Sequence, residues 1–290
     1  KWAAIKELYT EQKKAMHEDA VFFEFFELNR HWLVPYAAFS YLRDKYKTPD
    51  FSQWKAHSVY NEAAIQKFVD PTHKYYDEIA LYYFIQYHLH LQLKDATDYA
   101  HNNGIVVKGD IPIGIYRNSC DAWVEPALYN MSMQAGAPPD DFAVKGQNWG
   151  FPTYNWQRMA QDDFKWWRQR FEQMSAYFDA FRIDHILGFF RIWSIPMHAV
   201  EGIMGYFVPA LPVHINEFGQ RGMWFDYQRL CRPFINDSVL AELMGGDTEV
   251  LKPYLNDIGE GRFELKEAFN TQRKVEAYFE QLEKNDHNNR

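Results

Sequence analysis

Apolar residues recur at helical spacing through most of the first 104 residues. Residues 2–17 mix polar and apolar positions at a helical period, and residues 22–28 and 32–46 carry apolar side chains three and four positions apart. Pro35 fits only the first turn of a helix, because proline has no N–H to donate. A long helix is predicted over residues 73–102, and its apolar stripe consists of Ile79, Tyr83, Tyr87 and Leu91. The pattern predicts packing helices throughout this part of the chain.

Two short β-branched or apolar runs interrupt the helical pattern. Gly104 ends the long helix, and residues 105–107 then predict a buried parallel strand. Residues 161–180 predict an amphipathic helix that leads to a second strand at residues 181–183. Helix, glycine turn and strand form the repeating unit of an α/β barrel. The sequence therefore predicts a helix-rich α/β fold that contains part of a (β/α)8 barrel.

The pattern weakens after Pro196. Residues 202–218 are loop-like, and helices are predicted over residues 224–230, 237–243, 248–255 and 263–283. The whole chain divides by pattern into three ranges. We expect a helical subdomain with barrel helices over 1–104, a central barrel portion over 105–196, and a mainly helical tail over 197–290.

Three polar residues stand at the carboxyl end of the second predicted strand, where barrel enzymes hold their catalytic side chains. They are Arg182, Asp184 and His185. Because Arg182 and Asp184 are two residues apart, an extended strand directs both side chains to one face. A neighbouring cation keeps a carboxylate ionised, which suits a nucleophile. A structural Arg–Asp pair would produce the same pattern, so the spacing alone leaves both interpretations open.

Two further segments carry polar and aromatic residues that could bind a ligand. Asp110 follows the first predicted strand, although a loop-capping carboxylate would look the same. Residues 130–156 form a long loop rich in glycine, proline and amide side chains, and such loops commonly bind ligands. Gln147 could bond sugar hydroxyls, while Trp149 and Tyr154 offer stacking faces. The adjacent Asp140 and Asp141 diverge, and capping is the ordinary role for one of them.

Composition narrows the class of protein. The net charge is −8 and no Lys/Arg cluster occurs, so we expect neither nucleic acid nor membrane as a partner. The chain has only two cysteines, Cys120 and Cys231, and no apolar run of about 18 residues, which predicts a soluble, cytoplasmic protein. His88 and His90 lie two apart on a helix and cannot share a metal, so no metal or cofactor is expected. Aromatic residues make up 18% of the chain, which suits either a core or a glycan site.

Three segments in order resemble the amylomaltases, the 4-α-glucanotransferases of glycoside hydrolase family 77. They are residues 108–123 (KGDIPIGI and NSCDAW), 136–154 (GAPPD, GQNWG and PTY) and 182–196 (RIDH, GF and WSIP). Residues 26–44 and 232–237 resemble the long subtype of plant cytosol and some bacteria. The resemblance implies that the chain is a piece of the catalytic domain and that residues 197–290 are the helical insertion of this subtype. The resemblance covers nearly the whole chain.

The resemblance implies a role for particular residues. Asp184 would be the nucleophile and Arg182 the group that keeps it ionised. The implied substrate contacts are Asp110, Asn118, Ser119, Trp123, Asp140, Gln147, Trp149, Tyr154, His185 and Trp193. The implied ligands are maltose, malto-oligosaccharides, and glycogen or other glucans.

The general acid that such a reaction requires is missing from the sequence. Residues 240–246 (LAELMGG) only imitate the family's Ala-Glu-Asp-Leu-Gly motif, and their context predicts a helix that ends at Gly245 and Gly246, so Glu242 is a weak substitute. Without its acid the isolated chain is expected to be inert. The alternatives are a retaining α-glucosidase, which would release glucose alone, and a glycan-binding piece without catalysis.

Overall fold

The computed structural model describes residues 1–245 and 249–288, and the chain forms two compact units. The first unit comprises residues 1–133 and 150–190, and the second comprises residues 134–149 and 191–290. These units are defined by contacts in space, whereas the ranges 1–104, 105–196 and 197–290 were expected from the sequence. The division into those three ranges therefore stays a prediction.

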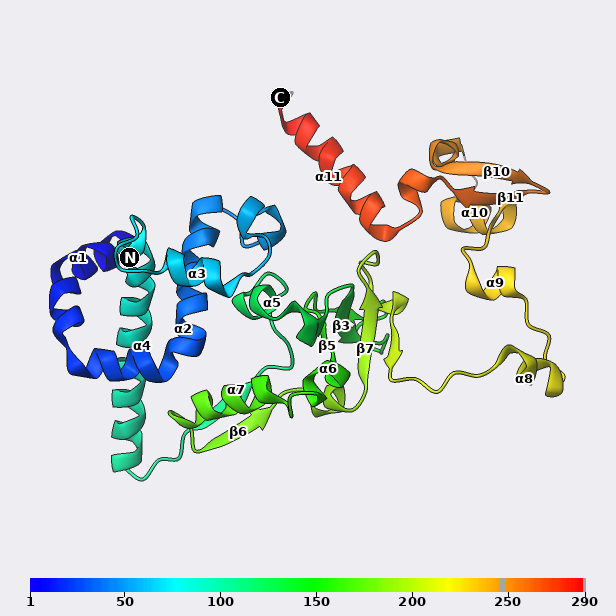
Figure 1. The fold of residues 1–290 in the computed structure, drawn as a ribbon. Helices are drawn as coiled ribbons and strands as arrows, with labels where there is room; N and C mark the ends of the chain where they lie inside the picture. The colour runs from blue at the N-terminus through cyan, green and yellow to red at the C-terminus, as the bar shows by residue number, and fades with distance from the viewer. Residues whose placement is uncertain (246–248, 289–290) are drawn as a thin grey trace. The chain divides into compact units, whose positions relative to one another are not determined.

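The first unit begins with a helical layer (Figure 1). It contains α1 (Trp2–Glu18), α2 (Ala20–Tyr46), α3 (Glu62–Phe68) and α4 (Tyr76–Asn102). The apolar stripes of these helices meet in one core, with Leu33, Leu42, Trp54, Ile65 and Ile79 fully buried. Removing this apolar surface from water stabilises the layer.

Helix α2 is one continuous helix, whereas the sequence predicted two separate ones. Pro35 lies inside it and is buried. Proline cannot donate to the carbonyl of His31, so one helical hydrogen bond is missing there. Leu33, Ala37 and Leu42 on the same helix are fully buried against the core. Burial on both sides of Pro35 outweighs the lost hydrogen bond and keeps the helix intact.

A parallel pair of strands forms the next layer of the first unit. Strands β1 (Lys108–Ile111) and β6 (Ala180–Ile183) pair in register, with Asp110 opposite Arg182. Helix α7 (Lys165–Ser175) makes the crossover between them. A Cβ on Gly109 would lie 2.6 Å from the Phe178 ring, so this side of β1 faces the segment that follows α7. Within the described residues, neither β1 nor β6 pairs with a third strand.

The first strand lies later in the chain than the sequence predicted. Residues 105–107 were expected to form it, but the ladder begins at Lys108. Val107 instead donates its N–H to the carboxylate of Asp179 at 2.9 Å, and its carbonyl accepts from the Asp179 N–H. Asp179 thus satisfies both backbone groups of Val107, while Ile105 and Val106 lie exposed outside the sheet.

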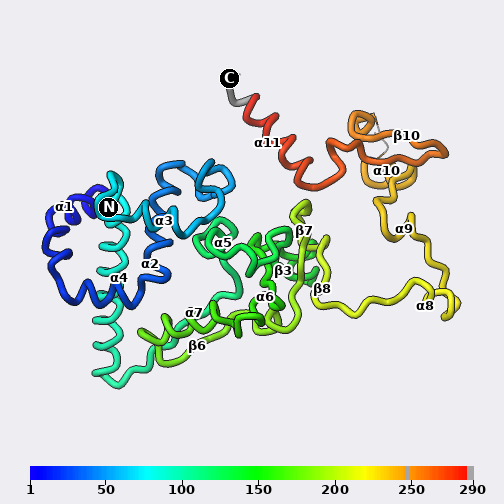
Figure 2. Tube along the Cα trace, in the orientation of Figure 1, coloured from blue at the N-terminus to red at the C-terminus, as the bar shows by residue number. Residues whose placement is uncertain are grey.

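A second core lies beside this sheet, still within the first unit, and Figure 2 shows the path of this part of the chain in green. It is built on α5 (Cys120–Val124), β2 (Tyr129–Asn130), β5 (Thr153–Tyr154) and α6 (Trp156–Ala160). Its buried members include Ile111, Leu128, Tyr154, Met159 and Trp167. This core fixes the sheet and α7 to the loop that carries residues 116–125.

The second unit contains two sheets. Strands β3 (Met133–Ala137), β4 (Gln147–Asn148), β7 (Ile192–Pro196) and β8 (Tyr206–Val208) form one in the order β4-β3-β7-β8. The short helices α8 (Ile215–Gln220) and α9 (Tyr227–Cys231) follow. Strands β9 (Ile235–Asn236), β10 (Leu255–Gly259) and β11 (Arg262–Leu265) form the other, and α10 (Asp237–Met244) and α11 (Gln272–Asn288) complete the unit.

The tail contains strands that the sequence did not predict. Residues 262–265 were assigned to a helix over 263–283, but they form β11 and α11 begins at Gln272. Gly259, Glu260 and Gly261 all have positive φ, which makes a tight hairpin turn between β10 and β11. Of the helix predicted over 248–255, residue 248 lies outside the described residues and residues 249–254 form 3-10 turns. The helix predicted over 237–243 is confirmed as α10.

Candidate active site

Asp110 and Arg182 form a two-point ion pair across the parallel strands. The Arg182 Nε donates to Asp110 Oδ1 at 3.0 Å, and a terminal guanidinium nitrogen donates to Oδ2. Both side chains are more than half exposed. The hydrogen bonds that Arg182 donates to Asp110, together with the negative charge of Asp110, raise the pKa of Arg182 above its usual value, and Asp184 adds a smaller attraction. The guanidinium is therefore fixed in orientation and permanently charged.

The pair lies on the face of the sheet opposite to the helical crossover. Successive side chains of a strand point to opposite faces, and Gly109 faces Phe178. Asp110 and its partner Arg182 therefore point the other way. This is the face on which Asp184 was expected.

Asp184 is exposed in the turn directly after β6. Its backbone N–H donates to the Ile111 carbonyl at 3.1 Å, which ties the turn to the end of β1. Within residues 1–245 and 249–288, its carboxylate forms no hydrogen bond and no ion pair shorter than 4 Å. The next residue, His185, has a left-handed backbone with φ of 50°, so the chain turns sharply behind the carboxylate. Asp184 is thus open to a ligand and near a fixed cation.

The loop after β1 places its predicted sugar contacts in different surroundings. Ser119 caps α5, because its Oγ accepts the Ala122 N–H at 3.3 Å. Trp123 is 2% exposed and donates its indole N–H to the His57 carbonyl at 2.9 Å. Asn118 is half-buried in the same loop. In this structure Trp123 packs in the helical core, and the roles of all three residues as sugar contacts stay predictions.

Tyr154 lies inside the second core. It is 7% exposed, and its ring packs against Trp156 and Trp167 at centroid distances of 5.1 and 5.3 Å. Burial is the main reason that the pKa of its hydroxyl is raised to about 12. Arg170 donates to that hydroxyl at 3.4 Å. A stacking role for Tyr154 stays a prediction.

The remaining predicted contacts belong to the second unit. Asp140 caps its own loop, because its Oδ1 accepts the N–H groups of Phe142 and Ala143. Gln147 accepts the indole N–H of Trp149 at 3.1 Å, so these two side chains form one exposed polar and aromatic group. Trp193 donates to the Gly202 carbonyl at 2.7 Å and packs edge-on against Phe207.

One exposed aromatic residue of this loop was not selected from the sequence. Phe142 is 99% exposed, directly after the Asp140–Asp141 pair. Exposed aromatic rings in long loops can contact a ligand. The signal for it in the sequence is its position beside the two aspartates in a Pro-rich turn.

The described residues show neither a cluster of metal ligands nor a helix that could span a membrane. In the part of the chain that the structure describes, no three His, Cys, Asp or Glu side chains come together as metal ligands. None of the described helices is both long and apolar enough to span a bilayer. His90, considered above as a ligand, instead contacts the Tyr177 hydroxyl at 2.8 Å.

Comparison with known proteins gives a consistent result along the chain. A family model described as 4-alpha-glucanotransferase, Glyco_hydro_77, matches residues 1–285. A 4-alpha-glucanotransferase of Oryza sativa subsp. japonica is 43% identical over 278 residues, which are 96% of this chain and 29% of the rice protein. A 4-alpha-glucanotransferase of Chlamydia pneumoniae is 34% identical over 67% of this chain and 36% of its own length. The chain therefore spans about a third of these curated relatives.

Solved structures agree with the family match. The amylomaltase from Streptococcus agalactiae in complex with acarbose superposes with a TM-score of 0.60 and 25% identity. The matched part is 70% of this chain and 44% of the amylomaltase. The likeness supports the helix-rich α/β architecture described above.

Proposed function

Since the chain belongs to glycoside hydrolase family 77, the 4-alpha-glucanotransferases, we propose that the protein carrying it moves α-1,4-glucosyl units between glucans. The donor is maltose or a malto-oligosaccharide, and the acceptor is a longer glucan such as glycogen. The observation that carries this proposal is the open carboxylate of Asp184 beside the Asp110–Arg182 pair at one end of the parallel strands. Fold likeness alone would not assign the chemistry.

The proposed reaction is a double displacement with retention. The Asp184 carboxylate attacks the anomeric carbon of the donor, and the glycosidic oxygen leaves with a proton from an acid. This forms a glycosyl ester on Asp184 and releases the shortened donor. An acceptor hydroxyl then gives its proton to the same acid/base group and attacks the anomeric carbon, which frees Asp184.

Arg182 and Asp110 support the nucleophile in this scheme. Arg182 is held in place by Asp110, and its positive charge attracts the negative charge of Asp184. The Asp110 carboxylate is about half exposed, so oxygen lone pairs remain available for sugar hydroxyls. Asn118 and His185 lie on the adjoining segments and complete the proposed donor contacts.

We propose that the loop over residues 130–156 binds the acceptor glucan. Gln147 and Trp149 present an amide and an indole together, and Phe142 presents an exposed ring. Such groups bind a sugar by hydrogen bonds to hydroxyls and by contact with C–H faces. Asp140 and Trp193 shape this loop and its neighbour.

We propose that the general acid comes from another part of the full-length protein, outside residues 1–290. A retaining enzyme needs a second carboxyl group about 5–5.5 Å from the nucleophile. Glu242 lies exposed on α10 in the second unit, and α10 ends at Gly245 with φ of 61°, which matches the predicted helix ending. Gly246 lies outside the described residues. General acid assistance is worth about 10²–10⁴ in rate, so we expect no measurable transfer by the 290-residue chain alone.

The finer fold assignment belongs to this proposal. Strand β1, crossover helix α7 and strand β6 form one parallel βαβ unit. Such units are the repeats of a (β/α)8 barrel, whose catalytic groups lie at the carboxyl ends of the strands. Asp184 follows β6 at that end. We propose that β1 and β6 are neighbouring strands of a barrel completed by the rest of the protein.

Substitution of the nucleophile tests the function. In the full-length protein, Asp184→Asn should lower transfer from maltose to glycogen by roughly 10³-fold or more, since the glycosyl ester cannot form. Asp163→Asn, in the exposed pair with Arg168, is the matched control and should leave transfer unchanged. Product analysis by chromatography follows both glucose and longer glucans.

Each other outcome identifies a different protein. Glucose without longer glucans would indicate a retaining α-glucosidase. Full activity of the Asp184→Asn variant would reject Asp184 as nucleophile and favour a glycan-binding role for this region. Robust transfer by the verified 290-residue chain would contradict the proposed external acid.

A further inference from the structure

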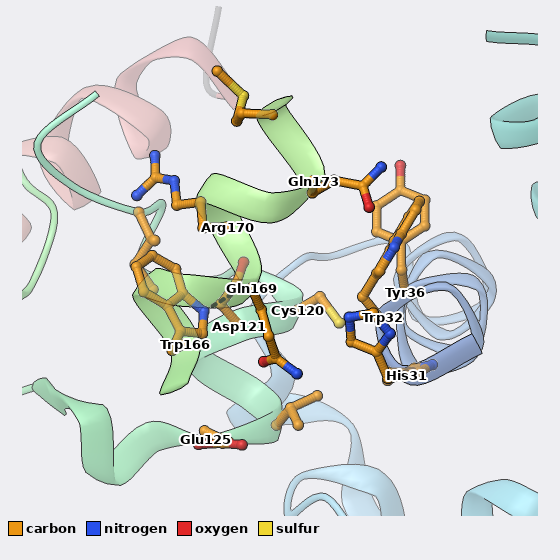
Figure 3. A pocket seen from close by; sticks show the side chains of 14 residues that line it. His31, Trp32, Tyr36, Cys120, Asp121, Glu125, Trp166, Gln169, Arg170 and Gln173 are labelled. Carbon is orange, nitrogen blue, oxygen red and sulfur yellow. Dashed lines mark hydrogen bonds between the residues drawn. The ribbon is translucent and has the colours of Figure 1, made fainter. Parts of the chain in front are cut away.

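A cavity of about 390 Å³ lies in the first unit between α2, α5 and α7 (Figure 3). Its volume is within the range of about 300–1,000 Å³ that small-molecule sites occupy. None of the residues assigned above to the proposed catalytic site lines it. Its walls carry three aromatic side chains, Trp32 and Tyr36 from α2 and Trp166 from α7.

The cavity lies on the helical side of the first unit and not on the Asp110 face. Helix α7 contributes Trp166, Gln169, Arg170 and Gln173, which recur at helical spacing on one side of the helix. The same helix turns Phe171 toward Phe181 of β6, at 5.6 Å between ring centroids. Asp110 and Arg182 point to the opposite face of that sheet, so the cavity and the proposed catalytic groups are separated by the sheet itself.

Both tryptophans of the cavity are held by hydrogen bonds. The Trp32 indole N–H donates to Asn29 Oδ1 at 2.8 Å, and Asn29 is in turn anchored by donating to the Phe25 carbonyl at 2.8 Å. The Trp166 indole N–H donates to Asp121 Oδ1 at 2.9 Å. Rings that are fixed before binding lose little conformational entropy when a ligand stacks on them.

Polar groups with capacity to bind a ligand lie between these rings. Figure 3 shows the amides of Gln169 and Gln173 directed into the space between the α7 side and the α2 side. Among the described residues, no side-chain hydrogen bond involves the Gln169 amide. Glu125 adds a carboxylate at the rim, and the His31 carbonyl lacks a donor from Pro35. Amides and carboxylates at the edge of aromatic planes suit a neutral ligand with many hydroxyls.

We propose that this cavity is a second glucan site, which holds a segment of α-glucan chain away from the catalytic groups. The C–H faces of glucosyl units stack on Trp32 and Trp166, and their hydroxyls bond Gln169 and Glu125. The glucan class of the ligand rests on the proposed function, whereas the cavity and its fixed rings do not. Such a site would keep a polymeric substrate on the protein between transfer events.

Cys120 provides a site-specific readout, because it lines the cavity. Maltoheptaose should slow alkylation of Cys120 in the full-length protein about tenfold at saturation, measured by mass spectrometry of the peptide that contains it. Cys231 is exposed on the second unit and is the internal control, with no change expected. Burial raises the pKa of the Cys120 thiol, so the reaction is followed at pH 8.5. Equal alkylation with and without maltoheptaose would overturn the proposal.

Two cavity variants test the contacts. Trp32→Ala and Gln169→Ala should each raise the maltoheptaose concentration that half-protects Cys120 by about tenfold, a loss of about 1.4 kcal/mol. Trp224→Ala removes an 85% exposed tryptophan of the second unit and should change nothing. Circular dichroism melting verifies folding, and Gln169→Ala remains informative if Trp32→Ala unfolds. The site would be rejected if both variants fold and both protect Cys120 at the same maltoheptaose concentration as the unsubstituted protein.

The two proposals can fail separately. Asp184→Asn should abolish transfer and leave the protection of Cys120 intact. If Asp184→Asn keeps full transfer, the catalytic proposal fails while Cys120 still reports on the cavity. If protection is absent and Asp184→Asn abolishes transfer, only the second site is rejected.

Discussion

Arg182 makes its hydrogen bonds to Asp110, the residue opposite it in the ladder, and not to Asp184 two positions along its own strand. Neighbouring strands lie about 4.8 Å apart, whereas residues two apart on one strand are separated by about 6.6 Å. The guanidinium reaches the nearer carboxylate with two nitrogens. Asp110 therefore sets where the positive charge lies, and Asp184 remains open.

The first residue-scale prediction concerns the shape of this cation. In the full-length protein, Arg182→Lys should lower kcat/KM for transfer by about tenfold or more, because an ammonium group cannot make the two-point contact that fixes the charge. Steady-state kinetics with maltose and glycogen measure it. Arg168→Lys, which changes the exposed partner of Asp163, is the matched control and should be neutral. Equal kcat/KM for Arg182→Lys would show that orientation of the charge is unimportant.

At the scale of single elements, α2 supplies a direct test of the helical core. Leu33 is fully buried on this helix, whereas Leu28 on the same helix is 69% exposed. Leu33→Ala should reduce the free energy of unfolding by about 2–5 kcal/mol, because a cavity replaces buried methyl groups. Leu28→Ala should change it by no more than about 0.5 kcal/mol. Urea unfolding followed by circular dichroism compares them, and similar losses would contradict the assigned burial.

The hydrogen bonds of Asp179, which lies between α7 and β6, should make the free energy of unfolding depend on pH. Asp179 accepts the Val107 N–H and contacts His101 Nε2 at 2.8 Å, and these bonds lower the pKa of its carboxyl below the usual value of 3.8. A carboxyl with a lowered folded-state pKa stabilises the fold above its unfolded-state pKa, and this contribution disappears as pH falls through the folded-state pKa. Asp179→Asn should therefore destabilise the protein at pH 7 and have progressively less effect below pH 3.8.

Urea midpoints at pH 7 and at low pH measure this difference. Asp98→Asn, in the exposed pair with Lys94 on α4, is the control and should show little effect at either pH. If Asp179→Asn lowers the free energy of unfolding equally at both pH values, the contribution of the Asp179 hydrogen bonds to stability does not depend on ionisation of the carboxyl.

Across the whole molecule, the long amphipathic helices could be predicted, and so could β6 from residues 181–183, but the other short strands could not. The stripe of α4 repeats over many turns, so periodicity alone identifies it. Strand β11 has four residues, and its alternation is too short to compete with a helical assignment of the same residues. The start of β1 depends on Asp179, which lies 72 residues from Val107, and no local pattern contains that contact.

The candidate site divides in the same way. Asp184 and Arg182 were found because they share a motif of consecutive residues. The bond between Asp110 and Arg182 required the register of β1 against β6, which only the folded structure supplies. Burial of Trp123 and Tyr154 also depends on partners from distant helices and strands, so their packing was invisible in the loop sequence. The cavity between α2, α5 and α7 combines three separate segments and gave no sequence signal.

The separation of the two strands sets an order of assembly for the first unit. Asp110 and Arg182 are 72 residues apart, so closing that loop costs entropy before their strands can pair. Helices α2, α4 and α7 need only local contacts and form sooner. We infer that the charge pair at the proposed nucleophile is a late event on the folding pathway, and that helical signal recovers before a ligand can bind there.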